Sequence, residues 1–389
     1  MNSIDRRALI GFGLGAGFAT EALAQSVAQG NAVSEVAAPI RPEQSARYRV
    51  PFAVIGLDHA HIYSITDAMI RGGGVLSAFH ADDPQQIATF RKRYGMIRLA
   101  RSEEEILDDK TIRLVAGAPI PDRRAPLGIR VMRAGKDFLS DKPAITTLAQ
   151  LADVRSAVRE TGRKFAVMYS ERLEVPAAVM AGDLVRQGAI GRVVQTINIA
   201  PHRVSAPSRP AWFWQKERYG GILTDIGSHQ ADQFVFYTGS KRANVVASQT
   251  GNLANPEHPA FEDFGDMTVV GDGGTGYIRV DWFTPDGLPT WGDGRAFLLG
   301  TEGYIELRKY IDVGGRPGSN HLFIADRKGA RYMDCSKVPL PFGPQFINDI
   351  VERTSVAQDQ EGALLAAELV LMAQKTATRP MLADEGDKA

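Results

Sequence analysis

Strand and helix patterns alternate along the first part of the chain. The apolar runs FAVIGL (52–57) and IRLVAGA (112–118) predict buried strands. Between such runs, apolar residues recur at helical spacing, as at Ile62, Ile65 and Met69. Repeated alternation of this kind predicts a doubly wound, Rossmann-like parallel sheet over residues 48–168.

After about residue 169 the pattern changes to a period of two. Alternating runs such as VVQTINIA (193–200) and TGYIRVDWF (275–283) are separated by turns rich in Gly or Pro. Helical spacing returns at 174–187 and at about 344–377. We expect an α+β domain with an open, mostly antiparallel sheet over residues 169–380, followed by a solvated tail at 381–389.

Composition narrows the classes of partner. The chain has 389 residues, 44% of them hydrophobic, with 45 basic and 45 acidic side chains. Without net charge there is no field to attract nucleic acid or an anionic membrane, so a small-molecule substrate is expected. The single cysteine, Cys335, excludes an internal disulfide and a cysteine-based zinc site.

The first 24 residues differ in kind from the rest. Arg6 and Arg7 precede a weakly apolar, glycine-rich run that ends in Ala22-Leu23-Ala24, a pattern typical of a twin-arginine export signal. The run is too short and too rich in glycine for a stable membrane span. We expect a folded protein exported to the periplasm or secreted, with a flexible mature tail at 25–47.

The segment GGILTDIGSHQADQF (220–234) carries the strongest chemical signal. Asp225 and His229 are four residues apart on a predicted helix, where a carboxylate can orient the imidazole and raise its basicity. Such a histidine suits removal of a proton from an alcohol. The alternative is a buried, hydrogen-bonded histidine with a structural role.

Lys142 follows a predicted strand in GKDFLSDKPAITT (135–147), at the sheet edge where doubly wound proteins bind ligands. Its ammonium can reach a substrate hydroxyl or a cofactor ribose. The alternative is a solvated lysine at the start of a helix.

The segment VIGLDHAH (54–61) permits a different function. A metal-dependent hydrolase of the amidohydrolase type needs His-x-His, a lysine, two further histidines and an aspartate. The chain can supply these in order as His59, His61, Lys142, His202, His229 and Asp266. This alternative requires a barrel of alternating strands and helices, whereas the second half predicts an antiparallel sheet. The preferred interpretation therefore includes no metal ligand.

The segments around Lys142 and His229, together with residues 162–199 and 298–307, resemble the Gfo/Idh/MocA oxidoreductase family over roughly residues 50–378. The resemblance implies a Rossmann domain that binds NAD or NADP and a substrate that is a sugar, glycoside or cyclitol. It also implies that His229 is the general base, that Asp225 orients it, and that Lys142 binds the reacting hydroxyl. Asp141 occupies the acidic position of the family's Glu-Lys-Pro motif.

The family's G-x-G-x-x-G turn falls on residues 56–61, and only Gly56 is retained. Asp58 places a carboxylate beside the phosphates unless it caps the following helix. His59 or His61, which flank Ala60, can offset that charge by donating to a phosphate oxygen.

Further resemblance concerns the ribose. The family's ribose-binding acid falls on Ala81, with Asp82 next to it, while Arg123, four residues after Pro119, is available for a 2′-phosphate. NAD and NADP both remain open, and we expect tight binding of whichever is used.

Substrate contacts are expected from residues 201–221, which bring His202, Arg203, Trp212 and Trp214 before the His229 segment. Aromatic faces stack on sugar rings, but core packing or a subunit interface would explain the tryptophans equally well. The open sheet offers a face for a homo-oligomer. Two further functions stay open: a glycoside lyase or hydrolase that oxidises its substrate transiently, and a scaffold that binds without turnover.

Overall fold

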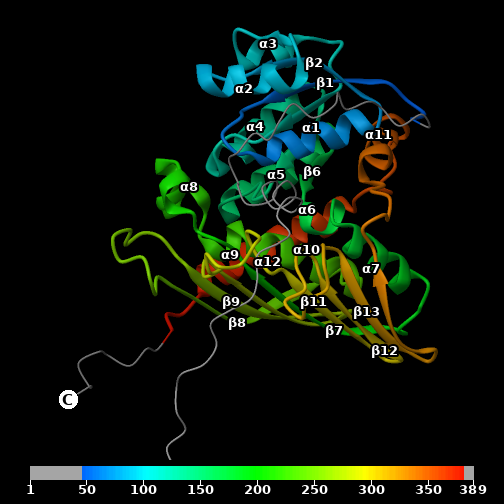
Figure 1. The fold of residues 1–389 in the computed structure, drawn as a ribbon. Helices are drawn as coiled ribbons and strands as arrows, with labels where there is room; N and C mark the ends of the chain where they lie inside the picture. The colour runs from blue at the N-terminus through cyan, green and yellow to red at the C-terminus, as the bar shows by residue number, and fades with distance from the viewer. Residues whose placement is uncertain (1–45, 381–389) are drawn as a thin grey trace, which may run out of the picture.

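The computed structural model describes residues 46–380 (Figure 1). The predicted export signal at 1–24 and the tail at 381–389 lie outside the described residues, as does the tail at 25–47 apart from its last two residues. In the part of the chain that is described, no helix combines the length and apolar character needed to cross a membrane.

Six parallel strands form the first sheet, in the order β3-β2-β1-β4-β5-β6. This is the strand order of dinucleotide-binding Rossmann folds and confirms the predicted doubly wound sheet. The strands are β1 (Val50–Ile55), β2 (Gly74–His80), β3 (Arg98–Leu99), β4 (Leu114–Gly117), β5 (Asp137–Asp141) and β6 (Phe165–Met168). The connecting helices are α1 (His61–Arg71), α2 (Pro84–Tyr94), α3 (Glu103–Asp108), α4 (Pro121–Arg133) and α5 (Leu148–Thr161).

The strand order reverses between β1 and β4, and ligands bind beyond the carboxyl ends of strands at such a point. Gly56 follows β1 there with φ +80°, and a Cβ on it would lie 2.7 Å from the backbone nitrogen of Pro119. The one glycine retained from the family's turn therefore sits where no other residue fits.

Eight strands form the second sheet, in the order β14-β13-β12-β11-β7-β10-β9-β8. All neighbouring pairs are antiparallel except β7 and β10, so the predicted open, mostly antiparallel sheet is confirmed. The strands are β7 (Val193–Pro201), β8 (Ala243–Gly251), β9 (Phe264–Gly271), β10 (Gly274–Asp281), β11 (Arg295–Gly300), β12 (Gly303–Arg308), β13 (His321–Asp326) and β14 (Gly329–Asp334).

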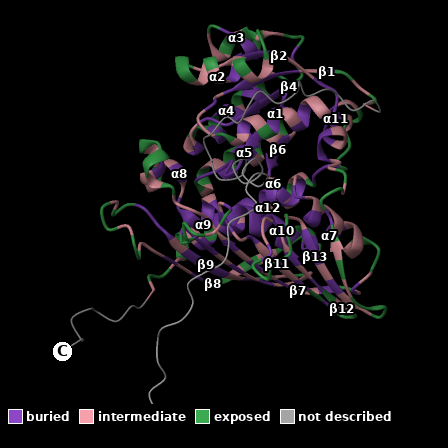
Figure 2. Ribbon diagram, in the orientation of Figure 1, coloured by how far each residue is buried: buried purple, intermediate pink, exposed green. Residues whose placement is uncertain are grey.

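Helices lie between the two sheets, and Figure 2 shows buried residues concentrated in them and in the strands. They cover one face of the second sheet, which explains its period of two: Leu298 is fully buried, whereas its neighbour Leu299 is 46% exposed. These helices are α6 (Ser170–Leu173), α7 (Pro176–Arg186), α9 (Ile222–Asp225), α10 (Gly227–Thr238) and α12 (Gln360–Thr376), with the short α8 (Lys216–Tyr219) beside them.

The apolar spacing over residues 344–377 corresponds to two helices, α11 (Phe342–Glu352) and α12, with a break that starts at Arg353 in a left-handed conformation. Helix α11 packs on α1 so closely that a Cβ on Gly343 would lie 2.1 Å from the Ala68 carbonyl oxygen. Between the helices, the Gln358 side chain accepts from Val167 N at 3.0 Å and donates to Val167 O at 2.8 Å, so it extends the edge of the first sheet.

Candidate active site

The carboxyl ends of β1 and β5 place side chains of the first sheet against α9 and α10. Lys142 directly follows β5, and its Nζ donates to Asp225 Oδ1 at 2.9 Å. The two side chains are 6% and 15% exposed. Burial alone would raise the pKa of the Asp225 carboxyl, but the Lys142 ammonium and its hydrogen bond outweigh burial and hold this pKa below its usual value. The pair is therefore ionic.

His229 lies in the first turn of α10 and is 2% exposed. Burial lowers its pKa well below the usual value, while the Glu171 carboxylate opposes this effect. Its Nδ1 is buried and has no hydrogen-bond partner among the described residues. The imidazole is thus neutral near pH 7, and its Nδ1 has no hydrogen bond from the described part of the chain.

The prediction that Asp225 orients His229 is not matched by the hydrogen bonds of the structure. Asp225 ends α9, Ile226 interrupts the helix, and α10 starts at Gly227. The Asp225 carboxylate faces Lys142, and its carbonyl accepts from the Ser228 hydroxyl at 2.9 Å. The Asp225 carboxylate thus binds the Lys142 ammonium. The spacing of four residues had predicted that it would bind the His229 imidazole instead.

A second carboxylate, Glu171 on α6, was missed by the sequence analysis. Its Oε2 accepts from Lys309 Nζ at 2.8 Å and from Gln230 Nε2 at 3.0 Å, whereas its Oε1 is buried without a hydrogen bond among the described residues. Burial raises the pKa of Glu171, but Lys309 and then His229 outweigh it and bring this pKa to about 2. Its partner Lys309 is 138 residues away, so no local spacing pointed to this pair. The YSER segment, which contains Glu171, was the one sequence signal for this carboxylate.

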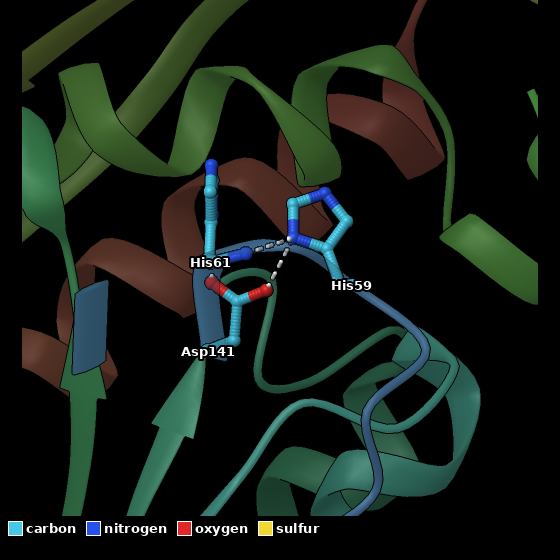
Figure 3. A group of neighbouring side chains, drawn as sticks. All are labelled: His59, His61 and Asp141. Atoms are coloured by element: carbon cyan, nitrogen blue, oxygen red, sulfur yellow. Dashed lines mark hydrogen bonds and ion pairs between the residues drawn. The ribbon is translucent and has the colours of Figure 1, made fainter. Parts of the chain in front are cut away.

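His59 and His61 turn toward Asp141 (Figure 3). His61 Nδ1 lies 2.9 Å from Asp141 Oδ1, and His59 Nδ1 lies 3.0 Å from Oδ2. Arg124 Nη2 is 3.0 Å from the same Oδ2. Burial raises the pKa of Asp141, but Arg124, His61 and His59 outweigh it and leave this pKa well below its usual value. Both Nδ1 atoms face Asp141. A histidine that donates to a phosphate oxygen, as predicted, would therefore do so through Nε2.

Asp58 does not cap α1, so of the two alternatives for this residue the carboxylate beside the cofactor turn holds. The residue that precedes the helix is Ala60, and no side chain caps the first turn. Asp58 instead lines a pocket of about 450 Å³ beside Gly56 and Pro119. Burial raises the pKa of the Asp58 carboxyl, although a hydrogen bond from Gln86 lowers it in part.

The same pocket brings together the other residues predicted to bind a cofactor. Asp82 and Arg123 line it, and the Asp82 side chain is 98% exposed at the end of β2, where it can accept from a ribose hydroxyl. Its acidic residues are Asp58, Asp82, Asp83, Glu103 and Asp122, and its arginines are Arg123 and Arg130. The cradle at Gly56 and the exposed Asp82 therefore fit a dinucleotide, while Asp58 opposes its phosphates.

Of the residues predicted to contact substrate, His202 and Trp212 approach the site. Burial lowers the pKa of His202 to about 4. The nearby Glu171 carboxylate raises this pKa and the Lys142 ammonium lowers it. Trp212 lies 6.4 Å from His59, measured between ring centroids.

Two other predicted substrate contacts have structural partners. Arg203 donates to the carbonyls of Pro285 and Leu288 at 2.9 and 2.5 Å. Trp214 stacks on His258 at 3.6 Å between ring centroids.

The fold removes the basis of the amidohydrolase alternative, because the parallel sheet is open and no barrel forms in residues 46–380. Asp266 lies on β9, where it accepts from Gln249 Nε2 at 2.8 Å. The candidate metal-ligand group in the described residues is instead His59, His61 and Asp141.

Several characterised proteins are similar to parts of the chain. D-xylose dehydrogenase of Paenarthrobacter nicotinovorans is 27% identical over 149 residues, which cover 37% of this chain and 38% of that protein. Inositol 2-dehydrogenase of Acidothermus cellulolyticus is 25% identical over 205 residues, 52% of this chain and 57% of that protein. The chain thus matches about half or less of the length of these curated relatives.

Solved structures match over a greater length. A protein of Erwinia carotovora atroseptica, described only as a candidate oxidoreductase, is 47% identical, with a TM-score of 0.82 over 85% of this chain and 99% of that one. Levoglucosan dehydrogenase, solved with NADH and levoglucosan, shares the fold at 20% identity and a TM-score of 0.68 over 85% of this chain and 98% of that one. Residues 179–306 match the GFO/IDH/MocA C-terminal domain family. With its Rossmann sheet, its second sheet and these relatives, the chain belongs to the Gfo/Idh/MocA family.

Proposed function

We propose that the protein is a nicotinamide-dependent oxidoreductase that acts on a hydroxyl group of a sugar, glycoside or cyclitol. One observation carries the proposal: the ionic Lys142–Asp225 pair and the neutral, buried His229 meet beyond the carboxyl ends of a Rossmann sheet. A hydrogen-bond donor for an alcohol oxygen and a base for its proton are thus present where this fold binds ligands.

Gly56, Asp82 and Arg123 would hold the cofactor in the pocket at the ends of β1 and β2. When bound, a nicotinamide supplies a hydride acceptor for the carbon that carries the hydroxyl. The acidic Asp82 favours the 2′-hydroxyl of NAD over the 2′-phosphate of NADP, because a second negative charge would be repelled.

Different residues donate to the substrate oxygen and accept its proton. Lys142 Nζ donates to the substrate oxygen while its bond to Asp225 fixes its position. His229 accepts the hydroxyl proton on a ring nitrogen. Glu171, the carboxylate with the largest effect on His229, stabilises the imidazolium that forms. Burial of both groups strengthens this attraction, because the local dielectric is low.

The experiment is native mass spectrometry of protein purified without added nucleotide, followed by turnover measurements on a panel of sugars and cyclitols. The panel is run with NAD, with NADP, and with an artificial electron acceptor. We expect nucleotide binding at one per chain and oxidation of at least one polyol. A protein that binds neither nucleotide nor polyol would contradict the proposal.

The product distinguishes the remaining alternatives. Accumulation of reduced nicotinamide in step with substrate loss indicates net oxidation. Substrate conversion without accumulation indicates a lyase or hydrolase that restores its cofactor in each cycle. Binding of a sugar without conversion, even with the artificial acceptor, indicates a scaffold.

We also propose a homo-oligomer formed through the open face of the second sheet. Leu299 and Tyr304 are paired across β11 and β12 on that face, 46% and 53% exposed, and Val270 on β9 is 44% exposed. Light scattering of the purified protein and of a Leu299→Lys variant tests this, and a monomeric wild type would refute it.

A further inference from the structure

We propose that His59, His61 and Asp141 bind a divalent first-row transition-metal ion. This site goes beyond the proposed function, whose proton chemistry uses Lys142 and His229. It differs from a hydrolase centre because His229 is not a ligand. Three ligand atoms, one from each residue, lie within 4.8 Å of one another.

The spacing of the ligand atoms fits an ion with near-perpendicular ligands. The two Nδ1 atoms lie 2.9 and 3.0 Å from the carboxylate oxygens. An ion about 2.1 Å from each nitrogen and oxygen would have such separations at ligand angles of about 90°. Figure 3 shows His59 in the loop after β1 and His61 at the start of α1, both beside the Asp141 carboxylate. Two imidazoles and a carboxylate with further positions open are a known set for Zn²⁺, Fe²⁺ and related ions.

The Asp141 carboxylate presents one oxygen, Oδ2, to both Arg124 and His59 at 3.0 Å. Asp141 is fully buried, and its Oδ2 makes no hydrogen bond among the described residues. His59 Nδ1 lies 3.0 Å from this oxygen and 3.4 Å from the His61 backbone N–H, from which it accepts a long hydrogen bond, so this nitrogen is unprotonated in that arrangement. Two acceptor atoms at this distance repel each other unless a proton or a cation lies between them, and a bound metal ion supplies that cation.

Arg124 is the main opposing charge, since its Nη2 lies 3.0 Å from Asp141 Oδ2. Arg124 is held from the other side by the carbonyls of Pro119 and Lys142, so it does not enclose the carboxylate. The carboxylates of Asp141, Asp225 and Asp58 all attract the Arg124 guanidinium, and this offsets part of its repulsion of a bound ion.

The histidine side of the site is open. The side chains of His59 and His61 are 26% and 36% exposed, whereas Asp141 closes the other side. An ion held there keeps positions for oxygen ligands, either water or a substrate hydroxyl. His59 and His61 belong to the same turn, residues 56–61, whose first residues line the proposed nucleotide pocket. The ion would therefore lie next to that pocket.

The test uses nucleotide-free, full-length protein and Co²⁺ as a spectroscopic probe, with Zn²⁺ content measured after dialysis. Wild type is expected to bind one Co²⁺ per chain, with a visible d–d absorption that Zn²⁺ displaces. His61→Ala and Asp141→Asn are expected to weaken binding about tenfold or more. His258→Ala, which removes a histidine stacked on Trp214, is the matched control and should bind as wild type does.

Absence of stoichiometric Co²⁺ or Zn²⁺ binding by wild type would overturn the site, and so would binding unchanged in His61→Ala. Because Asp141 is buried, circular dichroism checks that its variant folds, and the half-exposed His61 gives an answer even if that variant does not. The readout involves neither nucleotide nor turnover. Failure of the metal site and failure of the oxidoreductase proposal are therefore distinguishable.

Discussion

Lys142 Nζ and Asp225 Oδ1 lie 2.9 Å apart, and this buried ion pair joins the end of the parallel sheet to the helix before His229. The contact links residues 83 positions apart in the sequence. It holds the lysine ammonium at the site, and it keeps the aspartate ionised because the nearby positive charge lowers the pKa of Asp225.

Replacing this lysine tests its role in the reaction. Lys142→Met is expected to lower kcat about 100-fold or more, because the donor to the substrate oxygen is lost, while nucleotide affinity stays close to that of wild type. Steady-state kinetics and nucleotide titration measure the two effects. Lys241→Met, which removes a lysine paired with Asp359 on the surface, is the control. Equal kcat for Lys142→Met and wild type would refute the role.

His229 makes stability depend on pH in a defined direction. Its pKa is well below the usual value in the folded protein because it is buried, so below about pH 6.5 the unfolded chain binds a proton that the folded chain does not. Stability is therefore lost as pH falls from there. His229→Gln should reduce the slope of unfolding free energy against pH by up to about 1.4 kcal/mol per pH unit, as measured by urea unfolding. Identical slopes would mean that the imidazole is charged when folded.

Asp58 is expected to weaken nucleotide binding. Asp58→Asn removes a carboxylate from the pocket wall and should lower the Kd for NAD about tenfold, since one repulsive charge is lost. Burial raises the pKa of Asp58, so wild-type affinity should increase as pH falls, and the variant should lack that increase. Calorimetric titration across pH measures both. Asp153→Asn, an exposed position on α5, is the control, and weaker binding by the Asp58 variant would contradict the expectation.

The Arg172–Asp232 pair is expected to stabilise α10 against α6. Arg172 donates two hydrogen bonds to the carboxylate, at 2.5 and 2.9 Å, and both residues are buried. Arg172→Met should lower the free energy of unfolding by about 3–5 kcal/mol, because it leaves a buried carboxylate unpaired. The double variant Arg172→Met/Asp232→Asn should recover part of this loss. A single variant as stable as wild type in urea would show that the carboxylate finds another partner.

Both sheets could be predicted because their strands are buried in different patterns, and each pattern leaves its own spacing of apolar residues in the sequence. Inner strands of the first sheet are buried on both faces, as in β4, where all residues are buried, so they form continuous apolar runs. In β10 buried and half-buried residues alternate along most of the strand, which gives the period of two. The break between α11 and α12 was not predicted, because apolar spacing continues through a turn that a backbone angle at Arg353 creates.

The site was only partly predictable. Spacing and family resemblance indicated Lys142, Asp225 and His229, but not which carboxylate each cation meets. The sequence left open whether Asp58 caps the following helix, and the helix start decides it: the helix starts at His61, so the capping position is Ala60 and Asp58 is two residues too early. The Glu171–Lys309 and Arg124–Asp141 contacts cross between distant segments and leave no local pattern.

The close packing of Gly343 on α1 and the bonds of Gln358 to β6 have a practical meaning for dissecting the protein. A fragment that ends after residue 168 would contain all six strands of the first sheet, yet it would expose the flank of α1 and leave Val167 at the sheet edge unpaired. Expressed alone, such a nucleotide-binding half is expected to aggregate or unfold, because the last helices of the chain form part of its surface. The first sheet is thus expected to reach its stable folded state only together with the last helices of the chain.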